Sequence, residues 1–261
     1  MSLHLIQGVA VEDSGSGPAV VCVHGLGGTS NTWSAMQSAF EGLRWIRVDM
    51  PGSGRSALDV SAVRIEDMVS CLQTVCKALG ITQAQWVAHS MGTIVCQHLA
   101  VTSPALVKSL VLFGPLMSPA DAAREGLRKR AENIQKEGLA GMQAVADQLL
   151  ATAVSSHTKV NHPSAYSFVR ESLMRQTPKA YAAHCLALAS AQTAAVEQIQ
   201  AQTLLVTGDE DLVATPDSVR AMARRMQHAR CVVLNRCGHW TPIEKPHECV
   251  RETRDFLKRH A

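Results

Sequence analysis

Short apolar runs rich in β-branched residues recur along the chain, and helical patterns separate several of them. Such runs are typical of strands that are buried on both faces of a parallel sheet. The clearest helical stripe places apolar residues between positions 65 and 79 on one face and ends at Gly80. Strands that alternate with helices predict an α/β fold with a mostly parallel central sheet flanked by helices. The runs occupy residues 19–23, 45–48, 85–88, 109–113, 203–207 and 231–234.

The alternation stops between residues 116 and 199, where helical periodicity continues without a strand-like run. A helical insertion in a parallel-sheet protein usually covers the carboxyl ends of the strands, where ligands bind. We therefore expect residues 1–115 and 200–261 to form the α/β core. Residues 116–199 are expected to form an all-helical cap inserted after the sixth strand. Because no repeat or flexible linker separates the two parts, we expect a single folding unit.

Composition argues against several classes of protein. The formal net charge is +3, and Lys and Arg are interleaved with Asp and Glu, so we do not expect nucleic-acid binding. No signal-like or membrane-spanning apolar stretch is recognisable, which favours a cytoplasmic protein without membrane contact. The eight cysteines contain no Cys-x-x-Cys pair and are expected to be reduced thiols rather than disulfide or zinc ligands.

Ser90 lies in a sequence that is typical of a strand, a tight turn and a helix. Residues 88–92 match the Gly-x-Ser-x-Gly pattern, with Ala88 in the first glycine position. In this pattern the serine has a strained backbone, and small residues two positions away let the strand and helix pack closely. We interpret Ser90 as a nucleophile. The alternative is that Ser90 only caps the following helix.

A glycine-rich loop follows the first apolar run, where residues 24–28 read His-Gly-Leu-Gly-Gly. Such a loop can turn backbone N–H groups toward a substrate oxygen. Together with the N–H of Met91, which directly follows Ser90, the N–H of Leu26 is predicted to form an oxyanion hole. The loop lacks the Gly-Lys-Ser/Thr and dinucleotide-binding patterns, so we do not expect a phosphate site there.

Acidic residues and a histidine follow the last two apolar runs. Asp209, Glu210 and Asp211 end the run at 203–207, and any of them suits the acid of a catalytic triad. Solvated turn carboxylates are the alternative. His239 follows the last run, which completes the order serine, acid, histidine. His24 and His89 also lie near the predicted site and remain alternative bases.

With these elements in this order, the sequence resembles the α/β-hydrolase fold family over essentially its whole length. The family pattern favours Asp211 as the acid, because its spacing from Gly208 and Pro216 matches. Residues 24–29, 138–147 and 181–188 look like the group of 3-oxoadipate enol-lactonase-like carboxylesterases. Two cap segments depart from that group. Residues 149–153 stand where it tends to carry a Trp-Phe pair, and residues 190–192 lack its usual Asp.

The resemblance implies a serine hydrolase with Ser90 as nucleophile, His239 as general base and Asp211 as the acid that orients it. It implies cleavage of a small ester or lactone, with no metal or cofactor. A carbon–carbon bond hydrolase or a cofactor-free perhydrolase would use the same triad, and a non-enzymatic small-molecule receptor would share the fold. Because aromatic residues form only 4% of the chain, small or aliphatic acyl groups are expected.

Cationic side chains in the cap offer partners for a substrate carboxylate, as a 3-oxoadipate-type lactone would require. The alternative, which the pattern favours, is that each is a solvated charge on a helix surface. These residues are Arg124, Arg128, Arg170, Arg175 and Lys179.

Overall fold

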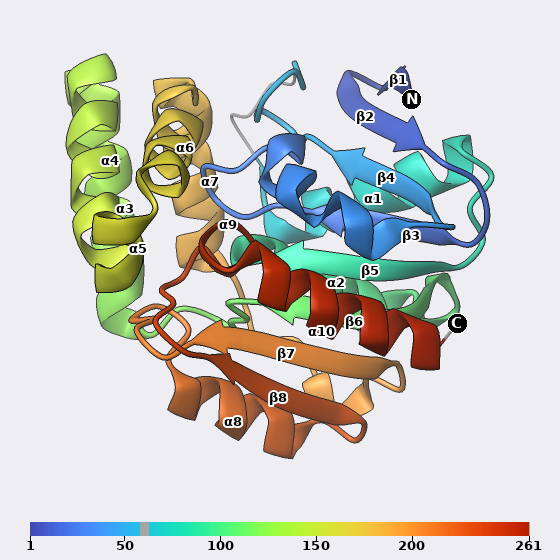
Figure 1. Ribbon diagram of the computed structural model, residues 1–261. Coiled ribbons are helices and arrows are strands. Elements are labelled where there is room, and N and C mark those ends of the chain that lie inside the picture. Colours follow the sequence, from blue (N-terminus) through green and yellow to red (C-terminus); the bar gives the residue numbers. More distant parts are fainter. Residues whose placement is uncertain (58–62, 261) are drawn as a thin grey trace.

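The computed structural model describes residues 1–57 and 63–260, and its centre is a sheet of eight strands (Figure 1). The strand order is β1-β2-β4-β3-β5-β6-β7-β8. Strand β2 is antiparallel to β1 and β4, and all pairs from β4 to β8 across the sheet are parallel. The predicted mostly parallel sheet is therefore confirmed. The strands are β1 (Ser2–Ile6), β2 (Val9–Ser14), β3 (Ala19–Val23), β4 (Arg44–Val48), β5 (Ala84–His89), β6 (Val107–Phe113), β7 (Gln202–Gly208) and β8 (Ala229–Leu234).

Helices cover both faces of the sheet. On one face, η1 and α10 pack over an apolar cluster that includes Cys22, Val87 and Val206 from the strands. Figure 1 shows α10 in front of the sheet and α1 and α2 behind it, so the strands are buried on both sides. The helical segments of the core are η1 (Ser30–Phe40), α1 (Ile65–Ala78), α2 (Met91–Thr102), η2 (Pro104–Leu106), η3 (Val196–Gln198), α8 (Pro216–Arg225), α9 (Thr241–Glu244) and α10 (Pro246–Arg259).

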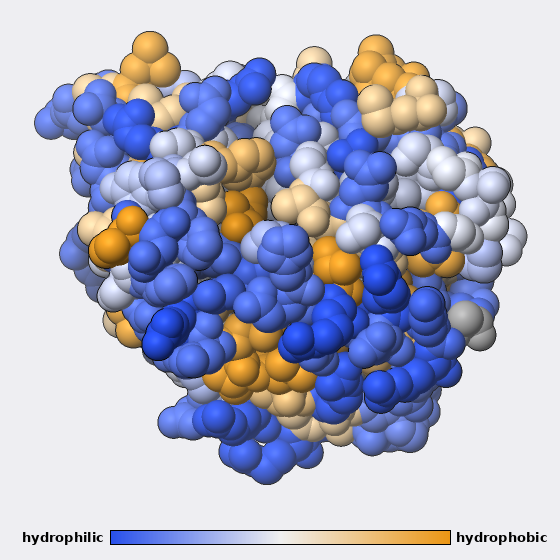
Figure 2. All heavy atoms as spheres, viewed as in Figure 1, coloured by the Kyte–Doolittle hydropathy of each residue, from blue (hydrophilic) through white to orange (hydrophobic). Residues whose placement is uncertain are grey.

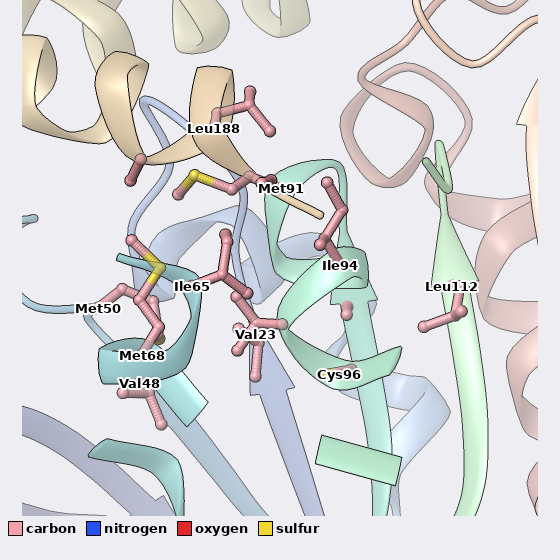
Figure 3. Packing of buried hydrophobic residues seen from close by; sticks show 14 of the residues in the cluster. Val23, Val48, Met50, Ile65, Met68, Met91, Ile94, Cys96, Leu112 and Leu188 are labelled. Carbon is pink, nitrogen blue, oxygen red and sulfur yellow. The ribbon is translucent and has the colours of Figure 1, made fainter. Parts of the chain in front are cut away.

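Helix α1 illustrates how the sequence pattern becomes packing. Its apolar stripe is buried, and Figure 3 shows Ile65 and Met68 against Val23 of β3 and Val48 of β4. The helix ends just before Gly80, whose φ of 67° is favourable for glycine and terminates the helical geometry. The stripe and the stop predicted from the sequence are both confirmed.

Five helices follow β6 and lie together at one end of the strands (Figure 1). Leu188 of the last of them packs near Met91 and Ile94 of α2, so the inserted helices share an apolar cluster with the core (Figure 3). The predicted helical insertion after the sixth strand is confirmed, while its status as part of one folding unit stays a prediction. The helices are α3 (Asp121–Glu137), α4 (Leu139–Ala153), α5 (Ser156–Asn161), α6 (Pro163–Met174) and α7 (Pro178–Ser190), and we call them the cap.

The outer surface is mostly hydrophilic on the face shown in Figure 2, and apolar residues appear there in separate areas. One such area lies over the edge strand β8, where Cys231, Val232 and Val233 are half-buried. None of the helices in the described part of the chain is long and apolar enough to cross a membrane. The eight cysteines are all unpaired.

The buried stripe of α1 predicts a specific stability difference. Leu72 is fully buried, so Leu72→Ala would remove packed methyl groups and lower the free energy of unfolding by about 2–5 kcal/mol. Leu139 is 70% exposed, and Leu139→Ala is expected to change it by less than about 0.5 kcal/mol. Urea denaturation followed by circular dichroism measures both, and equal effects would contradict this account of the core.

Candidate active site

Ser90 occupies a tight turn between β5 and α2. Its backbone has φ 51° and ψ −122°, a conformation that is rare for a residue with a side chain. The turn is held by hydrogen bonds from the Ser90 N–H to Phe113 O, at 2.9 Å, and from the Thr93 N–H to Ser90 O, at 2.8 Å. This is the predicted strand-turn-helix arrangement, and it presents the serine side chain at the carboxyl ends of the strands.

Glycines beside the turn permit the close backbone approach that it needs. A Cβ atom at Gly92 would lie 2.6 Å from the carbonyl oxygens of Val23 and His24. A Cβ atom at Gly25 would lie 2.7 Å from Ser90 Cβ. Neither position has room for a side chain, whereas Ala88 fits its place with 0% exposure. This explains why the motif has glycine at position 92 and accepts alanine at position 88.

The side chains of Ser90, His239 and Asp211 form a continuous hydrogen-bonded chain. His239 Nε2 lies 2.8 Å from Ser90 Oγ, and His239 Nδ1 lies 2.8 Å from Asp211 Oδ2. Ser90, His239 and Asp211 follow the ends of β5, β8 and β7 and are 8%, 6% and 2% exposed, respectively. The structure thus brings together three residues that are far apart in the sequence, in the order serine, histidine, carboxylate.

The neighbouring acids of Asp211 have other partners. Asp209 accepts a hydrogen bond from the Cys237 N–H at 3.1 Å. Glu210 accepts one from the Ser156 N–H of the cap at 2.8 Å. Of the three acids that the sequence left open, Asp211 is the one in contact with His239.

The electrostatics of Asp211 and His239 favour an ionised carboxylate beside a basic imidazole. Burial alone would raise the pKa of Asp211, but His239 and the N–H groups of Ala214 and Val213 lower it to about 2. These two N–H groups each donate to Asp211 Oδ1 at 2.8 Å. Burial would lower the pKa of His239, but the charge of Asp211 and its hydrogen bond outweigh it and raise that pKa. The carboxylate therefore stabilises the protonated imidazole.

A buried carboxylate, Glu244, holds the loop that carries His239. Its Oε2 accepts hydrogen bonds from the N–H groups of Gly238, at 3.1 Å, and of Ser155 in the cap, at 2.8 Å. Its Oε1 accepts one from the Trp240 N–H at 3.1 Å. The residues on either side of His239 are therefore tied to one side chain, and the same side chain ties them to the cap.

The glycine-rich loop is fixed by contacts that leave the predicted donors available. His24 donates from Nδ1 to Gly25 O at 2.8 Å and accepts from the Met50 N–H at Nε2, at 2.9 Å. Among the described residues, the N–H groups of Leu26 and Met91 donate to no protein acceptor. Leu26 and Ser90 both line the same cavity, so the loop and the nucleophile face one space.

The cap also holds this loop directly. Ser172 of α6 donates to Gly27 O at 2.7 Å. Gln176, just after α6, donates from its amide to Gly27 O and Gly28 O, each at 3.3 Å. The carbonyl groups of the loop thus point to the cap, which orients the peptide units next to Leu26.

The alternative bases have other hydrogen-bond partners. His89 donates from Nε2 to His239 O at 2.8 Å, and burial lowers the pKa of its imidazole to about 3. Burial likewise lowers the pKa of His24, whose ring nitrogens are both engaged with the backbone. Both rings are therefore neutral supports of the surrounding backbone.

A cavity of about 520 Å³ lies between the core and the cap and includes Ser90 and His239 in its wall. Its volume is within the usual range for small-molecule sites. The wall is mostly apolar, and residues of the cap supply much of it. The apolar cap residues at the wall include Leu127, Leu149, Ala153 and Leu188.

The cap cations singled out from the sequence are absent from the described wall of this cavity. Arg124 donates to two backbone carbonyls, at 2.6 and 2.7 Å. Arg170 and Arg175 lie in exposed ion pairs, and Arg128 and Lys179 are exposed. Four of the five charges thus lie at the surface, as expected, whereas the half-buried Arg124 differs from the expected solvated charge because it is bound to the backbone. Two polar residues that do line the cavity, Arg130 and Tyr181, were not predicted as site residues.

The role of Glu244 leads to a prediction about stability. Glu244→Gln would place amide hydrogens against N–H donors, so the free energy of unfolding is expected to fall by about 1–3 kcal/mol. Glu132→Gln, at an exposed position of α3, makes the same change of charge and is expected to stay within about 0.5 kcal/mol of the parent. Chemical denaturation compares the two, and an unaffected Glu244→Gln protein would refute the anchoring role.

Comparison with known proteins places these features in a family. The model of the alpha/beta hydrolase fold matches residues 18–246. A thermophilic esterase from Thermogutta terrifontis superposes with a TM-score of 0.91 and 26% identity, over 97% of this chain and 93% of that chain. The enol-lactonase from Burkholderia xenovorans LB400 superposes with a TM-score of 0.90 and 24% identity, over 98% and 100% of the two chains, which is a likeness of fold.

A relative with a different named reaction is similar over most of its length. The 2-hydroxymuconate semialdehyde hydrolase of Pseudomonas sp. (strain CF600) is 28% identical over 266 aligned positions, covering 95% of this chain and 89% of that protein. These three proteins are thus named as an esterase, an enol-lactonase and a semialdehyde hydrolase. Because the family match spans most of the sequence, this chain belongs to the α/β-hydrolase fold family.

Proposed function

We propose that this hydrolase cleaves a small carboxylic ester or lactone through an acyl-enzyme on Ser90. The observation that carries the proposal is the chain of two 2.8 Å contacts from Ser90 Oγ through His239 to Asp211, with Ser90 at the cavity wall. A serine hydroxyl is a weak nucleophile unless a base removes its proton. His239, with its pKa raised by Asp211, is placed to do so.

In the first half of the reaction, Ser90 Oγ attacks the carbonyl carbon while its proton moves to His239 Nε2. The N–H groups of Leu26 and Met91 donate to the carbonyl oxygen as it becomes negative, and each is worth on the order of 3 kcal/mol of barrier. When the tetrahedral intermediate collapses, the C–O bond of the ester breaks and His239 gives its proton to the departing alcohol oxygen. The acyl group stays on Ser90.

In the second half, water replaces the alcohol. His239 takes a proton from the water as its oxygen attacks the acyl carbon, and then returns that proton to Ser90 Oγ as the acid product leaves. Asp211 stays ionised throughout and stabilises the imidazolium twice. For a lactone the alcohol and the acid belong to one molecule, so the product is a hydroxy acid or its keto form.

The choice of ester or lactone over a carbon–carbon bond rests on similarity to the Thermogutta esterase over nearly the whole chain. A carbon–carbon bond hydrolase is the second candidate, because the 2-hydroxymuconate semialdehyde hydrolase of Pseudomonas is 28% identical to this chain. The enol-lactone form of the proposal is supported by the sequence resemblance described above. Assays with a simple ester, a small lactone and a vinylogous diketone would separate the three.

Removing the nucleophile tests the proposal directly. Wild-type protein is expected to hydrolyse p-nitrophenyl acetate and to be labelled by a fluorophosphonate, while Ser90→Ala loses kcat by a factor on the order of 10³ or more. Ser53→Ala, at a buried serine away from the cavity wall, serves as the control and should retain labelling. An inert wild type, or equal turnover by Ser90→Ala, would overturn the assignment.

The pKa of His239 predicts the acid limb of the pH profile. Since His239 must be neutral to accept the serine proton and its pKa is raised above 6.5, kcat/KM is expected to fall as the pH drops through a value above 6.5. In Asp211→Asn the limb should move to lower pH, and kcat should fall by a factor on the order of 10⁴. Asp217→Asn, with a 96% exposed side chain, should keep the parent profile. An acid limb at the same pH in Asp211→Asn and in wild type would contradict the effect of Asp211 on the pKa of His239.

A further inference from the structure

The cavity beside Ser90 contains a fixed positive charge. Among its described wall residues, Arg130 of α3 is the only Lys, Arg, Asp or Glu. Most of its neighbours in the wall are apolar, so the field of the guanidinium is poorly screened there. A cation in such a wall attracts an anionic ligand and repels a cationic one.

Arg130 has no acidic partner to neutralise it. No carboxylate in residues 1–57 or 63–260 forms an ion pair with its guanidinium. This distinguishes it from Arg170 and Arg175, whose charges are paired within the cap. The half-buried Arg130 therefore retains donors for a ligand.

The hydroxyl of Tyr181 on α7 lies beside this guanidinium and lacks a partner. Its side chain is 0% exposed, and among the described residues the oxygen makes no hydrogen bond of good geometry, although Arg130 is close. Buried hydroxyls are nearly always paired, because an unpaired one loses its hydration without compensation. Tyr181 lines the cavity, so a ligand oxygen there would provide the missing partner.

Tyr181 is also close to the loop that holds Leu26. A Cβ atom at Gly27 would lie 3.2 Å from Tyr181 Cε2, so the hydroxyl end of the ring lies near the oxyanion loop. A group bound by Arg130 and Tyr181 would thus share the cavity with the carbonyl under attack. Because the two binding positions are this close, the group bound by Arg130 and Tyr181 has to belong to the same small substrate as the carbonyl under attack.

We propose that Arg130 and Tyr181 bind an ionised carboxylate of the substrate, so that the preferred ester or lactone carries a free carboxyl group. The planar guanidinium suits two parallel N–H contacts to a carboxylate, and the phenol O–H donates a further one. This inference rests on the proposed hydrolase function and specifies its substrate class. The two residues position the substrate and take no part in the proton transfers.

The first experiment measures substrate preference. Monomethyl esters of succinic, glutaric and adipic acid are compared with the corresponding dimethyl esters by pH-stat, because each pair differs mainly in the free carboxylate. Wild type is expected to show a kcat/KM about 10 to 100 times higher for at least one monomethyl ester than for its dimethyl ester, as charge-assisted hydrogen bonds imply. Equal or reversed preference at all three lengths would overturn the proposal.

The second experiment tests the two residues. Arg130→Met keeps the length of the side chain and removes the charge, so the ratio of kcat/KM between the two esters should collapse toward one. Tyr181→Phe removes only the unpartnered hydroxyl and should lower the ratio about 3- to 10-fold without loss of thermal stability. Arg128→Met makes the same replacement at an exposed site of α3 and should keep the parent ratio. An unchanged ratio in Arg130→Met would refute the assignment.

A binding measurement separates this inference from the proposed function. Isothermal titration of the three monomethyl esters into Ser90→Ala protein should show, for at least one of them, binding at least 10 times tighter than that of its dimethyl ester, and Arg130→Met in this background should abolish the difference. Such binding without any turnover by wild type would sink the hydrolase proposal and leave the carboxylate site standing. If wild type hydrolyses neutral esters and no monomethyl ester binds more tightly than its dimethyl ester, the hydrolase proposal stands and the carboxylate site is refuted.

Discussion

The close approach of two backbone segments at Ser90 is the constraint on which the site depends. The turn after β5 meets the end of β3, and only glycine fits at Gly25 and Gly92. This contact forces the positive φ of Ser90, directs its side chain to the ends of the strands and leaves the Met91 N–H beside it. The sheet supplies the rigidity that pays for this strain, since β5 and β6 are almost entirely buried.

The base and the acid depend on a second arrangement that joins the core to the cap. Glu244 binds both neighbours of His239 and the Ser155 N–H, while the His239 N–H donates to Ala153 O at 2.8 Å. The imidazole is therefore positioned by the last turn of α4 as well as by the loop after β8. Burial that would weaken the base is offset by the adjacent Asp211 carboxylate. The same few contacts therefore set both the position of the His239 imidazole and its basicity.

Sequence reasoning located β3 to β8 because their apolar runs differ in period from the helices, but it gave no position for β1 and β2. These strands are antiparallel at the sheet edge. Strand β1 is largely exposed, and in β2 the buried residues 9–11 are followed by Glu12 and Asp13, so neither strand has a long apolar run in its sequence. The residues alone left the acid open among three adjacent positions, because their distinct partners come from distant loops. Arg130 escaped notice among exposed charges of α3, since only packing against α7 brings it to the cavity.

The hydrogen bonds from Ser172 and Gln176 to the carbonyl groups of Gly27 and Gly28 have a consequence for how this enzyme could diversify. If the cap only covered the cavity, it could be exchanged, and substrate specificity could change without an effect on the reaction rate. Here α6 is part of the scaffold of the anion-stabilising loop. A foreign cap grafted onto this core would have to reproduce these donors, so new substrates are more accessible through replacement of individual wall residues than through exchange of the whole insertion.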